Sequence, residues 1–271
     1  MFDEVIACLD GSSLAETILP LARGLTTTKA GTLTLLRVVA DAVELATEEN
    51  YLRGCAHQFG GQLSFLVADN PAAAIGAELE RNPKAIAALT THGRSAWTEA
   101  IVGSVTLRVI RLAQRPVILY CPLGRDSAAP NKISKIVLAL DGSEFAERMI
   151  CHAADAAQSL AAQLLLVQAL PLGGPATLIK NPEKSDISES SYLHRQAAHI
   201  KKKYALNAQW EVLHGEPATA ICQYLKGMAE TMLVLTTHAR GGVERAMLGS
   251  VAAECIRHAG VPLLLYWPPE R

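Results

Sequence analysis

The sequence of 271 residues is poor in aromatic side chains and has no excess of positive charge. Aromatic residues make up 5% of the chain, and 25 Lys and Arg stand against 26 Asp and Glu, for a formal net charge of −1. Nucleic-acid binding needs a basic surface, and single-strand binding also needs aromatic stacking platforms. The composition therefore argues against nucleic acid as a partner, and it provides no broad basic face for an anionic membrane.

Long hydrophobic runs, a leader-like start and paired cysteines are also missing. The longest apolar stretches, such as Val261–Trp267, fall far short of the roughly 18 residues that a membrane helix needs. The first residues include Asp3 and Glu4 where a secretory leader would carry basic residues. Six cysteines are scattered without a C-x-x-C pair, which suits reduced, mostly buried thiols better than disulfides or a zinc site. We therefore expect a soluble, cytoplasmic protein without a membrane partner or a metal site.

Half of the residues are hydrophobic, and the chain repeats itself over the length of a whole domain. Residues 5–12 (VIACLDGS) return as residues 136–143 (IVLALDGS), at an offset of 131. Between residues 90 and 120, 14 of 31 positions match the residue found 146 positions later. The larger offset predicts an insertion between the second and third strands of the second half. Its natural place is Gly173–Ser190, as a surface loop, with a lid over a second site as the alternative.

The segment between the repeats has the composition of a linker, which predicts domains at residues 1–125 and 132–271. Short, mostly continuous apolar runs alternate with helical patterns in both, as in parallel sheets covered by helices on both faces. We expect an α/β fold of two tandem, Rossmann-like, doubly wound domains, each with a five-stranded parallel sheet. Expected strands lie near residues 5–9, 32–39, 62–67, 85–91, 117–120, 135–140, 163–169, 208–213, 231–237 and 263–266. Expected helices include residues 13–25, 71–81 and 103–113.

Three repeated features fall at the carboxyl ends of the expected strands, where open parallel sheets bind ligands. Asp10 and Asp141 follow the first strand of each half, and Gly103 and Gly249 stand at the start of the last helices. Residues 92–94 (HGR) and 238–240 (HAR) follow the fourth strands. A helix that begins Gly-Ser-Val offers free backbone N–H groups and the positive end of its dipole to an anion. An aspartate beside it can accept hydrogen bonds from a ribose. Together these residues predict a nucleotide site.

A purely structural role remains the alternative for each feature. Asp-Gly-Ser after a strand is a common turn with a helix cap, which alone explains Ser12 and Ser143. Gly-Ser before an apolar helix is also a common cap. Duplication copies structural features as faithfully as functional ones, so the repetition does not decide between the two roles.

The whole layout resembles the universal stress protein family, in a tandem form that covers nearly the whole chain twice. The resemblance rests on the aspartate after the first strand and on the phosphate-loop pattern G-x2-G-x9-G-[ST]. It implies an ATP site in each half, with Mg²⁺ as a companion ion left open. In the first half it implies ribose at Asp10, adenine at Val38, and phosphates at Gly93, Arg94, Gly103, Ser104 and Val105. The matching positions of the second half are Asp141, Ala169, Arg240, Gly249, Ser250 and Val251.

The sequence departs from that pattern in both halves. Thr90 and Thr236 occupy the first glycine position, and Ala239 replaces the middle glycine of the second half, next to a Gly241-Gly242 pair. At the exit of the third strand, Asp69 in the first half stands opposite Gly215 in the second. These departures predict nucleotide binding of unequal strength in the two halves.

The resemblance implies a nucleotide-binding stress-response protein that senses or stores ATP without rapid turnover. The alternative is a ligand-free scaffold that acts through contacts with an unidentified protein partner, and slow ATP hydrolysis stays open. The family also implies that strands 117–120 and 263–266 pair with each other, so that one chain mimics a homodimer. Association of two chains is left open.

Other chemistry finds little support in the sequence. It contains no G-x-x-x-x-G-K-[ST] loop, which excludes a P-loop NTPase. Asp10, His92 and Ser104 could form a hydrolase triad, but the G-x-S-x-G motif that carries the nucleophile of such enzymes is missing. His92 and His238 are expected to orient the loop that carries them. Residues 201–203, three lysines, are expected on a solvated helix face.

Overall fold

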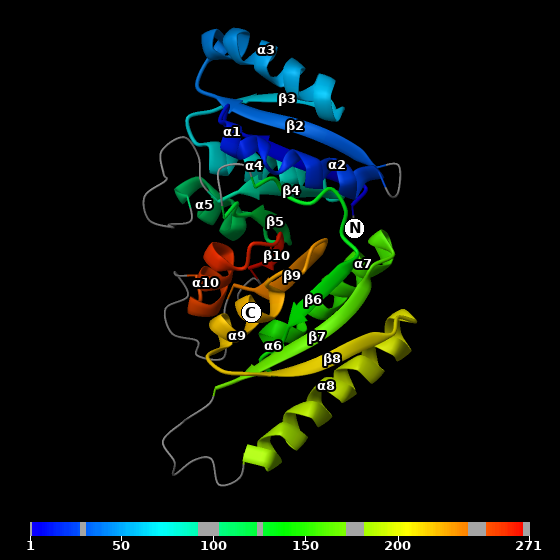
Figure 1. The fold of residues 1–271 in the computed structure, drawn as a ribbon. Helices are drawn as coiled ribbons and strands as arrows, with labels where there is room; N and C mark the ends of the chain where they lie inside the picture. Colours follow the sequence, from blue (N-terminus) through cyan, green and yellow to red (C-terminus); the bar gives the residue numbers. More distant parts are fainter. Residues whose placement is uncertain are drawn as a thin grey trace.

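The computed structural model describes residues 2–27, 31–91, 103–123, 127–171, 182–237 and 248–267, without the side chains of 182–189. It shows one sheet of ten strands, to which the two halves of the chain contribute equally (Figure 1). The first half forms β1 (Glu4–Leu9), β2 (Thr32–Val39), β3 (Gln62–Val67), β4 (Ala85–Thr90) and β5 (Val117–Tyr120). The second half forms β6 (Lys135–Ala139), β7 (Gln163–Leu170), β8 (Ala208–His214), β9 (Thr231–Thr236) and β10 (Leu263–Tyr266). Every expected strand is confirmed, with ends that differ by at most one residue.

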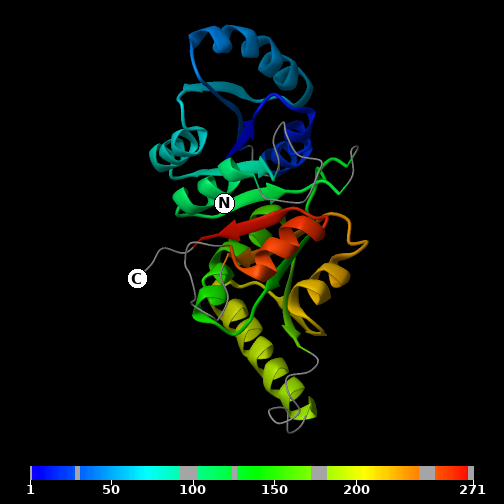
Figure 2. The same ribbon diagram turned by 90° about the vertical axis from the view of Figure 1, so that its left-hand side faces the viewer.

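The strand order is β3-β2-β1-β4-β5-β10-β9-β6-β7-β8. The second half therefore has the same five-stranded arrangement as the first, in reverse order across the sheet. All neighbouring strands are parallel except β5 and β10, which pair antiparallel with Leu119 opposite Leu263 and Val117 opposite Leu265. Both strands are apolar and buried, so each covers the edge that the other would expose. The expected pairing across the halves is confirmed, and Figure 2 shows the two end strands, green and red, side by side.

Helices cover both faces of the sheet and bury a separate apolar core on each. One core packs under α2 (Leu19–Thr27), α3 (Ala42–Phe59), α7 (Met149–Leu160) and α8 (Pro182–Tyr204). The other packs under α4 (Pro71–Arg81), α5 (Ser104–Leu112), α9 (Pro217–Leu225) and α10 (Ser250–His258). Each core runs through both halves, because the continuous sheet lets strand side chains alternate between the two faces over its whole width.

The expected helix over residues 13–25 is wrong in one respect, because it is broken into α1 (Ser13–Glu16) and α2. Pro20 has no N–H to donate to the carbonyl of Glu16, which interrupts a continuous helix there. The second half repeats the break between α6 (Glu144–Glu147) and α7 with Cys151 at the corresponding position. The break therefore belongs to the fold, and proline reinforces it in the first half only.

The expected insertion lies between β7 and β8, as predicted, but it is not simply a loop. Residues 182–190 form the first part of α8, which has 23 residues where α3 has 18. Pro182 suits the first turn of a helix, since its missing N–H would have no partner there. The preceding residues 172–181 lie outside the described chain. None of the described helices is both long and apolar enough to cross a membrane.

Candidate functional site

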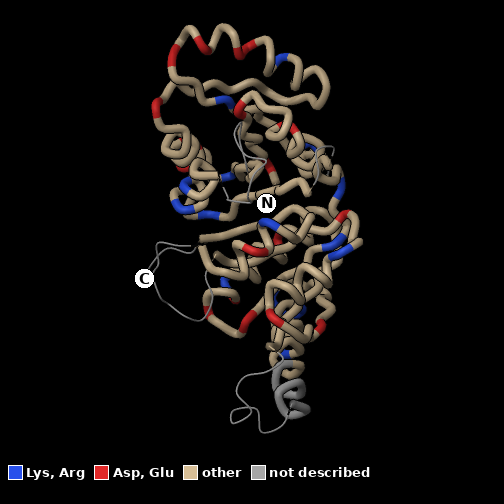
Figure 3. Tube along the Cα trace, turned by 60° about the vertical axis from the view of Figure 1, so that its left-hand side comes forward, with Lys and Arg blue, Asp and Glu red and all other residues tan. Residues whose placement is uncertain are grey.

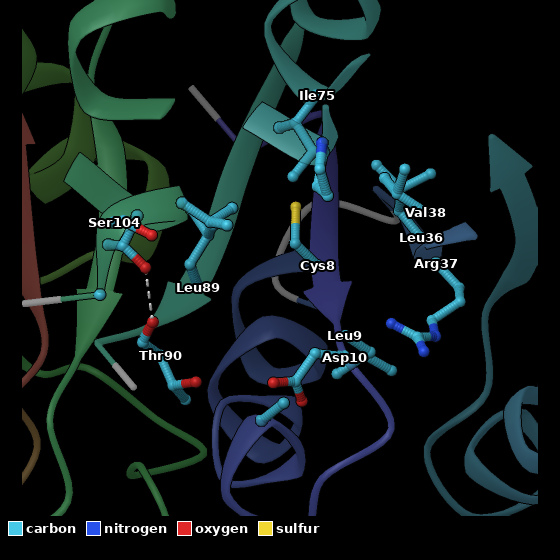
Figure 4. Close-up of a pocket in the computed structure, with 15 residues that line it drawn as sticks. Cys8, Leu9, Asp10, Leu36, Arg37, Val38, Ile75, Leu89, Thr90 and Ser104 are labelled. Atoms are coloured by element: carbon cyan, nitrogen blue, oxygen red, sulfur yellow. Dashed lines mark hydrogen bonds between the residues drawn. The ribbon is translucent and has the colours of Figure 1, made fainter. Parts of the chain in front are cut away.

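Two cavities open at the carboxyl ends of the parallel strands, one in each half. The first measures about 310 Å³ and lies between the ends of β1, β2 and β4 and the start of α5 (Figure 4). The second measures about 290 Å³ and lies between the ends of β6, β7 and β9 and the start of α10. Both stand beside the central strand of a half, where the direction of strand order reverses, which is where open α/β sheets bind ligands.

The cavities bring together most of the predicted site residues. The first is lined by Asp10, Val38, Gly103, Ser104 and Val105. The second is lined by Asp141, Ala169, Gly249 and Val251, while Ser250 begins α10 without lining the cavity. The remaining predicted positions, together with the two loop histidines and the glycine replacements, lie outside the described residues: Gly93, Arg94, Arg240, His92, His238, Ala239, Gly241 and Gly242.

Both site aspartates hold a turn as well as facing a cavity. Asp10 Oδ1 accepts hydrogen bonds from the backbone N–H of Ser12 at 3.0 Å and from its hydroxyl at 2.6 Å. Asp141 Oδ1 makes the same two contacts with Ser143, at 2.9 and 2.6 Å. The serine hydroxyls in turn cap the following short helices. The expected turn and cap are confirmed, and they occupy one carboxylate oxygen of each aspartate.

The two helices that begin at the cavities have no side-chain cap. At the N-cap positions Gly103 and Gly249, no side chain accepts a hydrogen bond from the first turn of α5 or α10. The first N–H groups of a helix lack intrahelical acceptors, so these two helix starts present donors and a positive dipole end. Ser104 and Ser250, the first helical residues, are exposed. This arrangement can receive an anion.

Gly103 is required by the protein backbone itself. Its N–H donates to the Thr91 carbonyl at 2.6 Å, and a Cβ added at Gly103 would lie 2.9 Å from that carbonyl oxygen. Its φ of −55° is ordinary for any residue, so the requirement is one of space. Gly249 repeats the contact with Thr237 at 2.7 Å. The glycine therefore positions the helix start against the end of the neighbouring strand, whether or not a phosphate binds.

Arg37, which sequence reasoning missed, lines the first cavity beside Asp10 (Figure 4). Only 6% of the residue is exposed. Its guanidinium donates to Glu44 at 3.2 Å and to Glu48 at 3.1 Å, both on α3. A buried charge persists when its partners compensate it, and here two carboxylates do so. The available signal was a charged residue inside the apolar strand TLTLLRVV.

The corresponding residue of the second half is Gln168, 131 positions later, and it lines the second cavity. It is 3% exposed, and its side-chain oxygen Oε1 has no hydrogen-bond partner among the described residues. The walls around it are largely apolar: Ala139, Leu140, Ala169, Leu170, Pro171, Pro217, Ile221 and Leu235. The second cavity therefore replaces a compensated cation with a neutral carboxamide.

The loop after the third strand also distinguishes the halves. Ala68 N–H donates to the Val39 carbonyl, and Gly215 N–H donates to the equivalent Leu170 carbonyl. Gly215, at φ +129°, therefore corresponds to Ala68, and the predicted pairing of Gly215 with Asp69 is wrong. The first half has one residue more before the N-cap of α4, and that residue, Asp69, lines a neighbouring pocket that shares Asp10 and Arg37 with the first cavity.

The cysteines of the chain are free thiols, three buried and three half-buried. Burial raises the pKa of Cys8, which lines the first cavity, to about 12. This thiol is protonated at neutral pH and does not act as a nucleophile there. Within the described residues, no group of three or more His, Cys, Asp or Glu is arranged to hold a metal ion.

Comparison with known proteins gives a consistent result. The family model described as "Universal stress protein family" matches residues 132–266. A universal stress protein of Thermus aquaticus is 30% identical over 138 residues, which cover 48% of this chain and 96% of that protein. One of Methanocaldococcus jannaschii is 26% identical over 149 residues, covering 52% of this chain and 86% of the relative.

The fold agrees over a greater length. The crystal structure of a universal stress protein from Archaeoglobus fulgidus overlays 98% of this chain and 99% of its own, at 16% identity and a TM-score of 0.73. Both halves are included in this overlay, whereas these two sequence relatives match about one half of the chain. The family-model match and the relative of 30% identity, 96% of which is covered, show that the chain belongs to the universal stress protein family.

Proposed function

We propose that the protein is a cytoplasmic, nucleotide-binding stress-response protein that holds ATP in its strand-end cavities without rapid turnover. The observation that carries this proposal is the repeated combination of an aspartate and an uncapped helix start in one cavity of each half. The helix start suits the phosphates of a nucleotide, and an aspartate carboxylate suits a ribose hydroxyl. The cytoplasmic placement is supported by six free thiols.

The cavities have the size and polarity that a nucleoside needs. Volumes of about 310 and 290 Å³ lie at the lower end of the usual range for small-molecule sites. Apolar residues from the second strand and from α4 or α9 form the side wall, with Ile75 in the first half and Ile221 in the second. A base packs against such a wall, while the polar groups lie toward the helix start.

Storage without rapid turnover is supported by the described residues that line the cavities. The Cys8 thiol has a pKa of about 12, and one oxygen of Asp10 and of Asp141 is held by a serine. Among the described lining residues, no histidine or lysine stands ready to transfer a proton at neutral pH.

A ligand-free scaffold is the second candidate, and one observation favours it. The aspartates and glycines of both sites each have a structural task, in the Asp-Ser turn and in the contact with Thr91 or Thr237. Their recurrence in both halves is therefore also explained by the fold alone.

Analysis of the small molecules carried by freshly purified protein distinguishes the two functions. The protein is denatured, and the released molecules are identified and quantified by mass spectrometry. ATP at one or two molecules per chain supports the proposal, and ADP in its place would indicate slow hydrolysis. An empty protein that also gives no thermal shift with ATP and Mg²⁺ would favour the scaffold.

A further inference from the structure

The carboxamide of Gln168 is an unpaired polar group inside the second cavity. The residue is 3% exposed, it lines the cavity, and its Oε1 has no hydrogen-bond partner in the described chain. Buried acceptors of this kind are rare in folded proteins, because an unsatisfied group loses its hydrogen bonds to water without replacement. An apolar side chain of the same size would fill this position at no such cost.

The first half shows what a satisfied group looks like at the same position. Arg37 is also buried near the end of the second strand, and its guanidinium is compensated by ion pairs with Glu44 and Glu48 of α3. Gln168 has no such partner for its oxygen among the described residues, and the residue lines the cavity.

The surroundings of Gln168 define the partner that this oxygen can take. Leu140 N–H donates to the Val167 carbonyl, which places Asp141 and Gln168 together at the ends of neighbouring strands. Apolar residues such as Leu170 and Ile221 line the rest of the wall, and α10 begins at the far side. A ligand that fits carries an apolar ring, an anionic group, and an O–H or N–H donor between them.

We propose that Gln168 Oε1 accepts a hydrogen bond from the nucleoside of the nucleotide bound in the second half, and that it sets the specificity of that site. This assignment rests on the proposed function. The donor is either a ribose hydroxyl, which lies between the base and the phosphates, or the exocyclic amino group at the outer edge of the base. The first half has no equivalent acceptor, because Arg37 carries donors only.

The test separates binding from folding by means of Gln168→Met, which keeps the volume and removes the acceptor. A Ser104→Asp background places a carboxylate at the exposed start of α5, which weakens the first site so that the tight phase of the titration reports the second. ATP affinity is measured by calorimetry, and thermal unfolding is followed without ligand. We expect Gln168→Met to weaken ATP binding about tenfold and to raise the melting temperature of the free protein. Gln163→Met, at the exposed beginning of the same strand, is the control and leaves both values unchanged.

Nucleotide analogues then identify the donor. 2′-Deoxy-ATP and 3′-deoxy-ATP each lack one ribose hydroxyl, and inosine triphosphate lacks the exocyclic amino group. The analogue without the relevant donor binds the protein that retains Gln168 about tenfold more weakly than ATP does, and Gln168→Met abolishes this difference.

Three results would overturn the assignment. Equal ATP affinity before and after the Gln168→Met substitution would show that the oxygen binds nothing, while leaving the proposed function intact. A melting temperature that falls together with the affinity would show that Gln168 acts through the fold. If the Ser104→Asp protein itself binds no ATP, the proposed function of the second half fails and the assignment fails with it.

Discussion

The two cavities share a backbone frame and differ in the side chains that the frame leaves unconstrained. Both keep the Asp-Ser turn and the glycine contact at the helix start, with distances that agree within 0.1 Å. They differ at the second strand, where Arg37 is bound by two glutamates and Gln168 has an oxygen unpaired among the described residues. They differ again at the loop where the first half adds Asp69.

This difference shows at which positions the fold itself requires a particular residue and at which positions the residue can vary with the ligand. Positions that terminate a strand or begin a helix are alike in both halves, because each satisfies backbone groups that would otherwise be orphaned. The positions that diverged make few such contacts. Figure 3 shows acidic and basic residues in both halves, and α3 carries a series of acidic residues. We expect the second cavity, which has a carboxamide in place of the arginine and largely apolar walls, to bind ATP more tightly than the first.

The largest expected effect is a loss of folding stability when Arg37 is replaced. Replacing Arg37 with Gln gives the first half the residue of the second and leaves Glu44 and Glu48 without their cation. We expect the free energy of unfolding to fall by about 2–3 kcal/mol, less than for a fully buried pair because Glu44 is 34% exposed. Urea denaturation measures this loss. Arg53→Gln, in an exposed pair with Glu49, is the control and costs at most about 0.5 kcal/mol. Similar losses in both variants would contradict the role given to Arg37.

The next effect tests the glycine contact that the halves share. In Gly103→Ala the new methyl group lies 2.9 Å from the Thr91 carbonyl oxygen, so the start of α5 has to shift. We expect a loss of about 1–2 kcal/mol in thermal or urea unfolding. Gly54→Ala in α3 meets no atom within 4 Å and is expected to stabilise the protein, by up to about 1 kcal/mol. A neutral Gly103→Ala would show that the spacing at Thr91 is not needed.

A third pair of variants sharpens the comparison at the ligand. Ser104→Asp and Ser250→Asp each add a carboxylate to an exposed helix start, where it suits the helix dipole and repels a phosphate. We expect each variant to lose about tenfold in ATP affinity at its own half, or about 1.4 kcal/mol, while thermal stability is kept. Since the second site is expected to be tighter, Ser250→Asp removes the high-affinity phase of a calorimetric titration. The variants Ser104→Ala and Ser250→Ala, which remove only a hydroxyl, serve as matched controls. Loss of the tight phase in Ser104→Asp instead would reverse the order of the two sites.

The smallest effect concerns the pH dependence of stability. His152 on α7 packs edge-on against Tyr266 at 5.2 Å, and burial lowers its pKa below the ordinary value of 6.5. The corresponding residue of the first half, 131 positions earlier, is the buried Leu21. The unfolded chain takes up this proton more readily than the folded protein, so stability is lost as the pH falls below about 6.5. His152→Leu is expected to flatten the change in melting temperature between about pH 7 and pH 5. An unchanged slope would show that other groups cause it.

The sequence predicts the strands and the meeting of the site residues for a physical reason. Continuous apolar runs mark buried parallel strands, and the carboxyl ends of such strands meet at one edge, which brought Asp10 and Gly103 together. The pairing of β5 with β10 followed from the family resemblance, and two apolar edge strands need such a cover.

Other features were beyond sequence reasoning because they depend on contacts between distant elements. The role of Arg37 depends on where α3 places Glu44 and Glu48, and the isolation of Gln168 depends on which groups of neighbouring elements reach it. The register that pairs Ala68 with Gly215 is set by hydrogen bonds to the second strand of each half, whereas a constant offset of 146 pairs Gly215 with Asp69. The signal that could have identified Arg37 and Gln168 was a polar residue at the same position of two apolar strands, β2 and β7.

The most direct test of nucleotide binding at the strand ends is a calorimetric titration of the unaltered protein with ATP and Mg²⁺. We expect saturable binding of one or two ATP per chain, with the tighter phase in the second half, and affinity about tenfold lower at both sites of the combined Ser104→Asp and Ser250→Asp protein. Absence of heat and of a thermal shift in the unaltered protein, or full binding by the doubly substituted one, would contradict this expectation.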